Sequence, residues 1–77
     1  MNNLLDEIKT FHAELKQTLE LYKGLEAQYM DEATEALQAV NLARWENTLD
    51  MAYGFRNKAI ALQEELEKLT HIIEHFE

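Results

Sequence analysis

The chain has 77 residues, of which 47% are hydrophobic, and it contains two glycines, no proline and no cysteine. Fifteen acidic against seven basic side chains give it a net charge of −8. This length allows one small domain over residues 1–77. The composition excludes a disulfide scaffold, a multidomain enzyme and a turn-rich β-sandwich, and the apolar content is too high for a chain that stays unfolded.

The first predicted helix covers about residues 3–29 and carries a heptad repeat. Mostly apolar side chains follow one another at alternating steps of four and three residues, the spacing of a helix face that packs on another helix. The row consists of Leu4, Ile8, Phe11, Leu15, Thr18, Tyr22, Leu25 and Tyr29.

Two further helices are predicted, at about residues 32–46 and 48–76. The last one carries a second row with the same alternation: Trp45, Leu49, Ala52, Arg56, Ala59, Leu62, Leu66, Leu69, Ile73 and Phe76. These rows predict an all-α fold, either an antiparallel helical hairpin or a three-helix bundle. We expect an oligomer, because so short a chain buries too little surface alone. In a hairpin, the single turn would lie at residues 29–32 or 44–48.

Arg56 is the unusual member of the second row, because it places a charge where a heptad core has apolar side chains. One interpretation is structural: the Arg56 side chain extends outward to water, or it pairs with Glu20 or Glu26 and fixes the register of the helices. The other is a site for a flat anionic ligand such as a nucleotide, since aromatic side chains and cations are close in sequence. The candidate ligand-binding residues are Arg44, Trp45, Tyr53, Arg56 and Lys58.

Two acidic clusters form the candidate interaction face. They consist of Asp31, Glu32 and Glu35, and of Glu64, Glu65 and Glu67. A negative field attracts basic protein surfaces and repels phosphates, so we expect a protein partner with a basic surface and no direct contact with nucleic acid. The sequence shows no long apolar run and no basic leader. We therefore expect no membrane contact and a cytoplasmic location, in the host cytoplasm if a phage encodes the chain.

Side chains for catalysis are scarce, because the sequence has neither serine nor cysteine. We therefore expect no enzyme activity and no cofactor. Glu67, His71 and His75 recur at every fourth residue and could hold zinc on one helix face. Histidines near a helix terminus are usually just solvated, however, and no metal is predicted.

Trp45 near the middle of the chain is followed by Ala52 and Tyr53. This pattern resembles the small WXG-type secreted helical hairpins. The resemblance implies that the tryptophan marks the turn, and that a four-helix dimer forms with a similar partner.

Residues 47–60 resemble the C-terminal helix of the phage hairpin proteins that sequester cyclic nucleotide signals. The matching positions are Leu49, Asp50, Ala52, Phe55, Lys58 and Ala59. This resemblance implies a sequestering protein of anti-defence type for a small anionic ligand.

The residues themselves favour a protein–protein interaction module. In this hypothesis a self-associating acidic helical protein acts as an inhibitor, adaptor or chaperone, and its sharpest form is a phage or bacterial antagonist of a basic nucleic-acid-binding machine. The alternatives are the ligand-sequestering protein and the WXG-like secreted hairpin or secretion chaperone.

Overall fold

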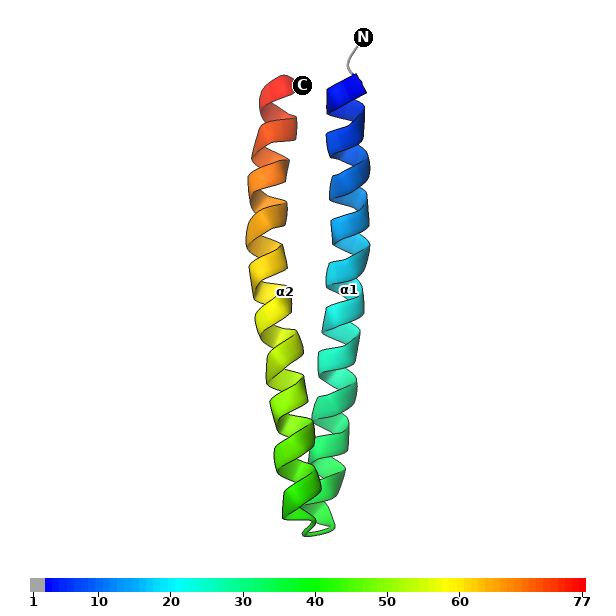
Figure 1. The fold of residues 1–77 in the computed structure, drawn as a ribbon, viewed down its shortest axis with the longest axis vertical. Coiled ribbons are helices and arrows are strands. Elements are labelled where there is room, and N and C mark those ends of the chain that lie inside the picture. The colour runs from blue at the N-terminus through cyan, green and yellow to red at the C-terminus, as the bar shows by residue number, and fades with distance from the viewer. Residues whose placement is uncertain (1–2) are drawn as a thin grey trace.

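The computed structural model describes residues 3–77 as two long antiparallel helices (Figure 1). Helix α1 covers Asn3–Gln38 and helix α2 covers Leu42–Phe76. They lie side by side and form a hairpin with extents of 60 × 14 × 13 Å, so that the start of α1 and the end of α2 share one end of the rod. Of the two predicted architectures, the hairpin is confirmed and the three-helix bundle is wrong.

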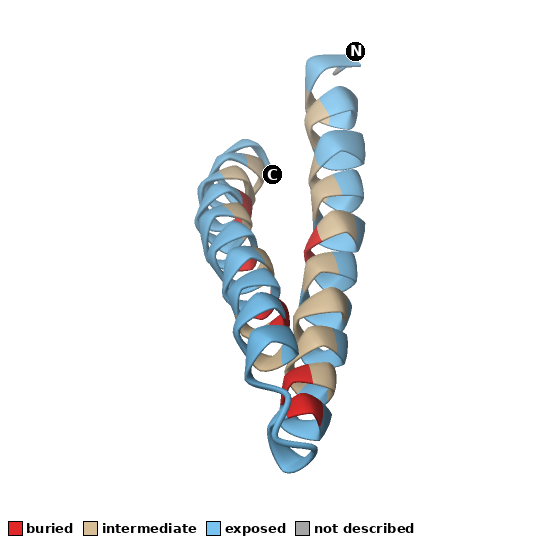
Figure 2. Ribbon diagram, turned by 60° about the horizontal axis from the view of Figure 1, so that its bottom comes forward, coloured by how far each residue is buried: buried red, intermediate tan, exposed pale blue. Residues whose placement is uncertain are grey.

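The turn of the hairpin lies at residues 39–41, between the two predicted positions, which are therefore both wrong. Helix α1 continues through residues 29–32, where the sequence predicts that one helix ends and the next, with Asp31, Glu32 and Glu35 near its start, begins. Two alanines just beyond it, Ala33 and Ala36, are buried against α2 (Figure 2). Tertiary packing therefore outweighs the preference of carboxylates for a helix N-terminus.

Hydrogen bonds at the turn explain how the chain reverses without glycine or proline. The N–H of Val40 donates to the carbonyl of Leu37 at 3.0 Å, and the N–H of Asn41 donates to that of Ala36 at 2.8 Å. This pair is the Schellman arrangement, with Val40 in the left-handed region at a φ of 56°. Asn41 then caps α2, because its Oδ1 accepts the N–H of Arg44 at 3.2 Å.

The core is a thin line of side chains along the surface where the two helices face each other (Figure 2). Near the turn its members are small, and farther out they include leucines. The buried residues are Ala33, Ala36, Thr48 and Ala52, and then Leu19, Ala59 and Leu66. Within residues 3–77 no large side chain is completely buried. The hairpin alone therefore leaves much of its apolar surface in contact with water.

Candidate functional site

The hairpin has two broad sides, one on either side of the line where α1 and α2 meet, and one of them is apolar. We call it the apolar side and define it by five exposed residues: Leu4, Phe11, Met51, Ile72 and Phe76, with exposed fractions from 40% to 70%. Leu4 and Phe76 line one hollow together. Phe11 follows Leu4 by one heptad and Ile72 follows Met51 by three, so that each pair shares a helix face.

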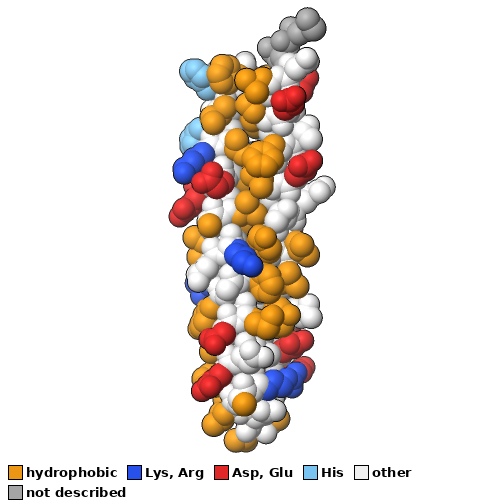
Figure 3. All heavy atoms as spheres, viewed as in Figure 1, with side chains coloured by type: hydrophobic (Ala, Val, Ile, Leu, Met, Phe, Trp, Pro, Cys, Tyr) orange, Lys and Arg blue, Asp and Glu red, His pale blue; other side chains and the backbone are white. Residues whose placement is uncertain are grey.

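Figure 3 shows this side as a column of hydrophobic side chains that runs over both helices, with one basic side chain near its middle and most of the charged side chains along its edges. Apolar surface in contact with water is unfavourable in proportion to its area, and a contiguous patch on a small protein marks a surface that binds another molecule. The apolar side is therefore the candidate functional site of the chain.

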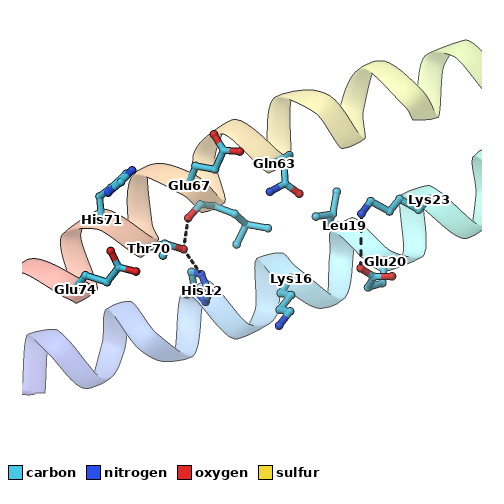
Figure 4. A pocket seen from close by; sticks show the side chains of 11 residues that line it. His12, Lys16, Leu19, Glu20, Lys23, Gln63, Glu67, Thr70, His71 and Glu74 are labelled. Atoms are coloured by element: carbon cyan, nitrogen blue, oxygen red, sulfur yellow. Dashed lines mark hydrogen bonds and ion pairs between the residues drawn. The ribbon is translucent and has the colours of Figure 1, made fainter. Parts of the chain in front are cut away.

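The opposite side, which we call the polar side, carries an open groove of about 340 Å³. Its lining carries charges of both signs, with Lys16, Glu20 and Lys23 on α1 and Glu67 and Glu74 on α2 (Figure 4). The closest of these pairs, Lys23 Nζ and Glu20 Oε1, are 4.0 Å apart. Because opposite charges are interspersed, the groove attracts neither anions nor cations strongly.

One hydrogen bond crosses between the helices in this groove, and sequence reasoning missed both of its residues. His12 Nε2 lies 3.0 Å from Thr70 Oγ1, and Thr70 Oγ1 donates to the carbonyl of Leu66 at 2.8 Å (Figure 4). The hydroxyl has one hydrogen, so His12 must donate to Thr70. The predicted row gave no signal for His12, because it passes through the preceding position, Phe11, and takes Thr18 instead of the buried Leu19.

An aromatic cluster near the middle of the hairpin positions Lys58. The rings of Tyr29 and Phe55 stack with centroids 5.7 Å apart, and the centroid of Tyr22 lies 6.0 Å from that of Phe55. Lys58 Nζ lies 5.4 Å from the Phe55 centroid and 5.9 Å from the Tyr22 centroid. The ring quadrupoles attract the ammonium group and hold it over the cluster.

Arg56 is not a core residue, so its predicted place in the second row is wrong. Its side chain is exposed, and Phe55, one residue earlier, makes the contacts with α1. Arg56 lines a hollow on the polar side together with Lys23, Glu26 and Glu64. The guanidinium therefore lies among carboxylates as well as near a second cation.

Tyr53 lies one helix turn before Arg56 in α2, but the other three candidate ligand-binding residues lie apart from Arg56. Lys58 lines a different hollow, with Met51 and Phe55. Tyr53 is 45% exposed, and Arg44 and Trp45 lie in the first turn of α2, close to the hairpin turn. A helix rises 1.5 Å per residue, so residues 45 and 56 are about 16 Å apart along the axis. The five side chains do not surround one cavity.

The two acidic clusters also lie far apart. Asp31 and Glu35 are exposed on α1 near the turn, with Glu32 half-buried between them. In α2, Glu65 lies 3.3 Å from Lys68 and Glu67 lines the polar groove. Successive helix residues are turned by about 100°, so Glu65 and Glu67 lie on opposite sides of α2. The acids surround the hairpin instead of forming one face.

An ion pair between Lys9 and Glu77 joins the start of α1 to the end of α2. The hydrogen bond from the ammonium to Glu77 and the charge of that carboxylate raise the pKa of Lys9 above its ordinary value. Both side chains are about half exposed, so the pair aligns the open end of the hairpin without burying charge.

Among residues 3–77, no group of three or more His, Asp or Glu side chains is arranged to hold a metal ion, and neither helix contains a stretch that is apolar enough to cross a membrane. Comparison of the chain with protein-family models, with curated proteins and with solved structures gives no match.

Proposed function

We propose that this chain is a non-enzymatic protein–protein interaction module. In this proposal, the hairpin self-associates through its apolar side and presents its acidic outer surface to a second protein with a basic surface. The observation that carries the proposal is the apolar side, whose five defining residues remain exposed although the helices are fully formed. Burial of such a patch is the main source of free energy in most protein associations.

The charge of the module supports a basic partner. A net charge of −8 on a rod of 60 × 14 × 13 Å produces a negative potential over most of its surface. Such a field speeds the approach of a basic protein and excludes acidic ones. A surface that normally binds nucleic acid is basic and elongated, which suits this rod, so an inhibitor of a nucleic-acid-binding protein is the form of the module that we favour.

A small anionic ligand has less support. Two candidate cations, Arg56 and Lys58, line separate hollows. The hollow of Arg56 also contains Glu26 and Glu64, which repel an anion. The arrangement therefore favours a macromolecular partner over a bound nucleotide.

The proposal is tested by capture of proteins from the native cell with the full chain as bait, followed by reconstitution from purified components. We expect a basic protein whose affinity falls steeply between 0.05 M and 0.5 M salt, because these charges are solvent-exposed. Substitution of Asp31→Asn with Glu35→Gln should weaken binding several-fold. The matched control, Glu7→Gln with Glu14→Gln, makes the same change in net charge elsewhere on α1.

One outcome would contradict the proposal, and another would contradict only the docking of the partner at the acids near the turn. Binding that is indifferent to salt would rule out electrostatic docking. Equal weakening by the test pair and the control pair would assign the effect to net charge and not to the acids near the turn.

A further inference from the structure

We propose that a second copy of this chain covers the apolar side, with α2 of one copy antiparallel to α2 of the other. In this arrangement Lys58 of each copy faces Glu65 of the other, and Met51 faces Ile72. The inference rests on the proposed function, because it specifies the self-association step. Charge complementarity along α2 and the surface area of the hairpin support this pairing.

Four exposed residues of α2 recur at intervals of seven: Met51, Lys58, Glu65 and Ile72. This spacing places them in one row along the helix, on the apolar side. In order along the chain the row is apolar, basic, acidic, apolar. Read in the opposite direction it is apolar, acidic, basic, apolar. An antiparallel copy therefore places cation on anion and apolar on apolar at all four positions, and two-fold symmetry forms each contact twice.

The same row disfavours the other pairings of α2 with itself. A slide of one heptad in one direction brings Lys58 against Lys58, and a slide in the other direction brings Glu65 against Glu65. A parallel pairing in register produces both clashes at once. Like charges that face each other across an interface are unfavourable, so the row specifies one register and one direction.

The surface area of the hairpin is that of a molecule with an uncovered side. A compact monomer of 9.0 kDa exposes about 4,900 Å². The hairpin exposes 5775 Å². The excess of roughly 900 Å² is close to the ~800 Å² that each partner contributes to an interface of standard size. A second copy on the apolar side would thus bring each chain to an ordinary exposed area.

The row also contains a space for a side chain from the second copy. Met51, Gly54, Phe55 and Lys58 line a shallow hollow of about 200 Å³. Nothing lies within 4 Å of the position that a Cβ would occupy at Gly54, so the backbone there is open to a close approach. Lys58 is held at this hollow by its contacts with the aromatic rings, which lowers the entropy lost when it pairs.

Charge reversal tests the pairing by sedimentation equilibrium at 0.05 M salt. The wild-type chain should be a dimer, and Lys58→Glu should raise its dissociation constant about tenfold or more. The double variant Lys58→Glu with Glu65→Lys should restore dimerisation. Lys16→Glu makes the same charge change on the polar side and should leave the dissociation constant unchanged. Circular dichroism of each variant checks that the helices persist.

Cross-linking tests the direction of the helices independently, because the chain has no cysteine of its own. Met51→Cys and Ile72→Cys replace side chains that are 40% and 41% exposed, so both variants should fold. In the proposed register, the two copies of residue 51 are about 31 Å apart, whereas residue 51 faces residue 72. A short bis-maleimide should therefore link a mixture of the two variants and neither variant alone.

Each failure overturns a different claim. A wild-type chain that stays monomeric at 1 mM overturns self-association. It does not affect the proposed binding of a basic protein, which the salt dependence tests separately. Three results would overturn the proposed pairing but not self-association. They are a dissociation constant that Lys58→Glu does not change, a failure of the double variant to restore the dimer, and cross-linking between two copies of residue 51.

Discussion

Val40 should be a source of strain that a glycine removes. Its φ of 56° lies in the left-handed region, which costs an L residue about 1–2 kcal/mol and suits a β-branched side chain least. The side chain is 76% exposed, so its removal loses little packing. Glycine costs about 0.5–1 kcal/mol more backbone entropy on folding. We therefore expect Val40→Gly to raise the free energy of unfolding by about 0.5–1 kcal/mol.

Thermal unfolding followed by circular dichroism at 222 nm, at one fixed protein concentration, measures this effect. For a domain of this size the gain corresponds to an increase in Tm of about 2–8 °C. Val40→Ala is the matched control, because it removes the branched side chain but keeps a Cβ in the left-handed region. A Tm of Val40→Gly at or below that of the wild type, or equal to that of Val40→Ala, would refute the account of the turn as strained.

Three further substitutions test the core, the surface and the open end. Leu66→Ala should lower the free energy of unfolding by about 2–4 kcal/mol in denaturant titrations, because Leu66 is 5% exposed; an unchanged midpoint would contradict its place in the core. Arg56→Leu should change stability by less than about 0.5 kcal/mol, since Arg56 is exposed, and a large loss would point to a partner for the guanidinium. Lys9→Met should lower Tm at pH 8. The folded-state pKa of Lys9 is raised, so the stability that the Lys9–Glu77 pair contributes is fully present below the ordinary pKa of 10.5 and is lost as the pH rises above it. A difference in Tm between the wild type and Lys9→Met that persists at pH 12 would exclude the ion pair as its cause.

The helical hairpin could be predicted from the sequence, but the position of its turn could not. Helix length and heptad spacing are properties of many residues together, so a few wrong assignments do not change them. The turn depends on three residues and contains no glycine or proline. Its one local signal is Asn41, which caps α2 in the structure, and a single asparagine does not distinguish a cap from an exposed helix residue.

The first heptad row illustrates a second limit of the sequence. The heptad spacing places Leu4, Phe11 and Thr18 in the predicted core row, because Leu4 and Phe11 are large and apolar and Thr18 continues their spacing. In the structure the neighbouring positions His12 and Leu19 face α2, and Leu4 and Phe11 are exposed. A hydrophobic pattern contains every apolar position on a helix. It therefore does not distinguish the face that packs on the other helix of the same chain from the face that stays exposed on the surface of the hairpin.

The position of the apolar surface on one side of the hairpin explains why we expect association to end at a dimer. A rod with apolar surface on both sides could add copies without limit, and open assembly follows when the contacting surfaces differ. Here the polar side carries charges of both signs, such as Lys23 and Glu20, and its exposed Ile60 lies in a hollow among Lys23, Arg56 and Glu64. The row from Met51 to Ile72 is complementary to itself, so in the proposed dimer each copy would cover this row of the other. The surface that drives association would then be buried, and the acids on the outer faces of both copies would stay exposed to a partner of opposite charge.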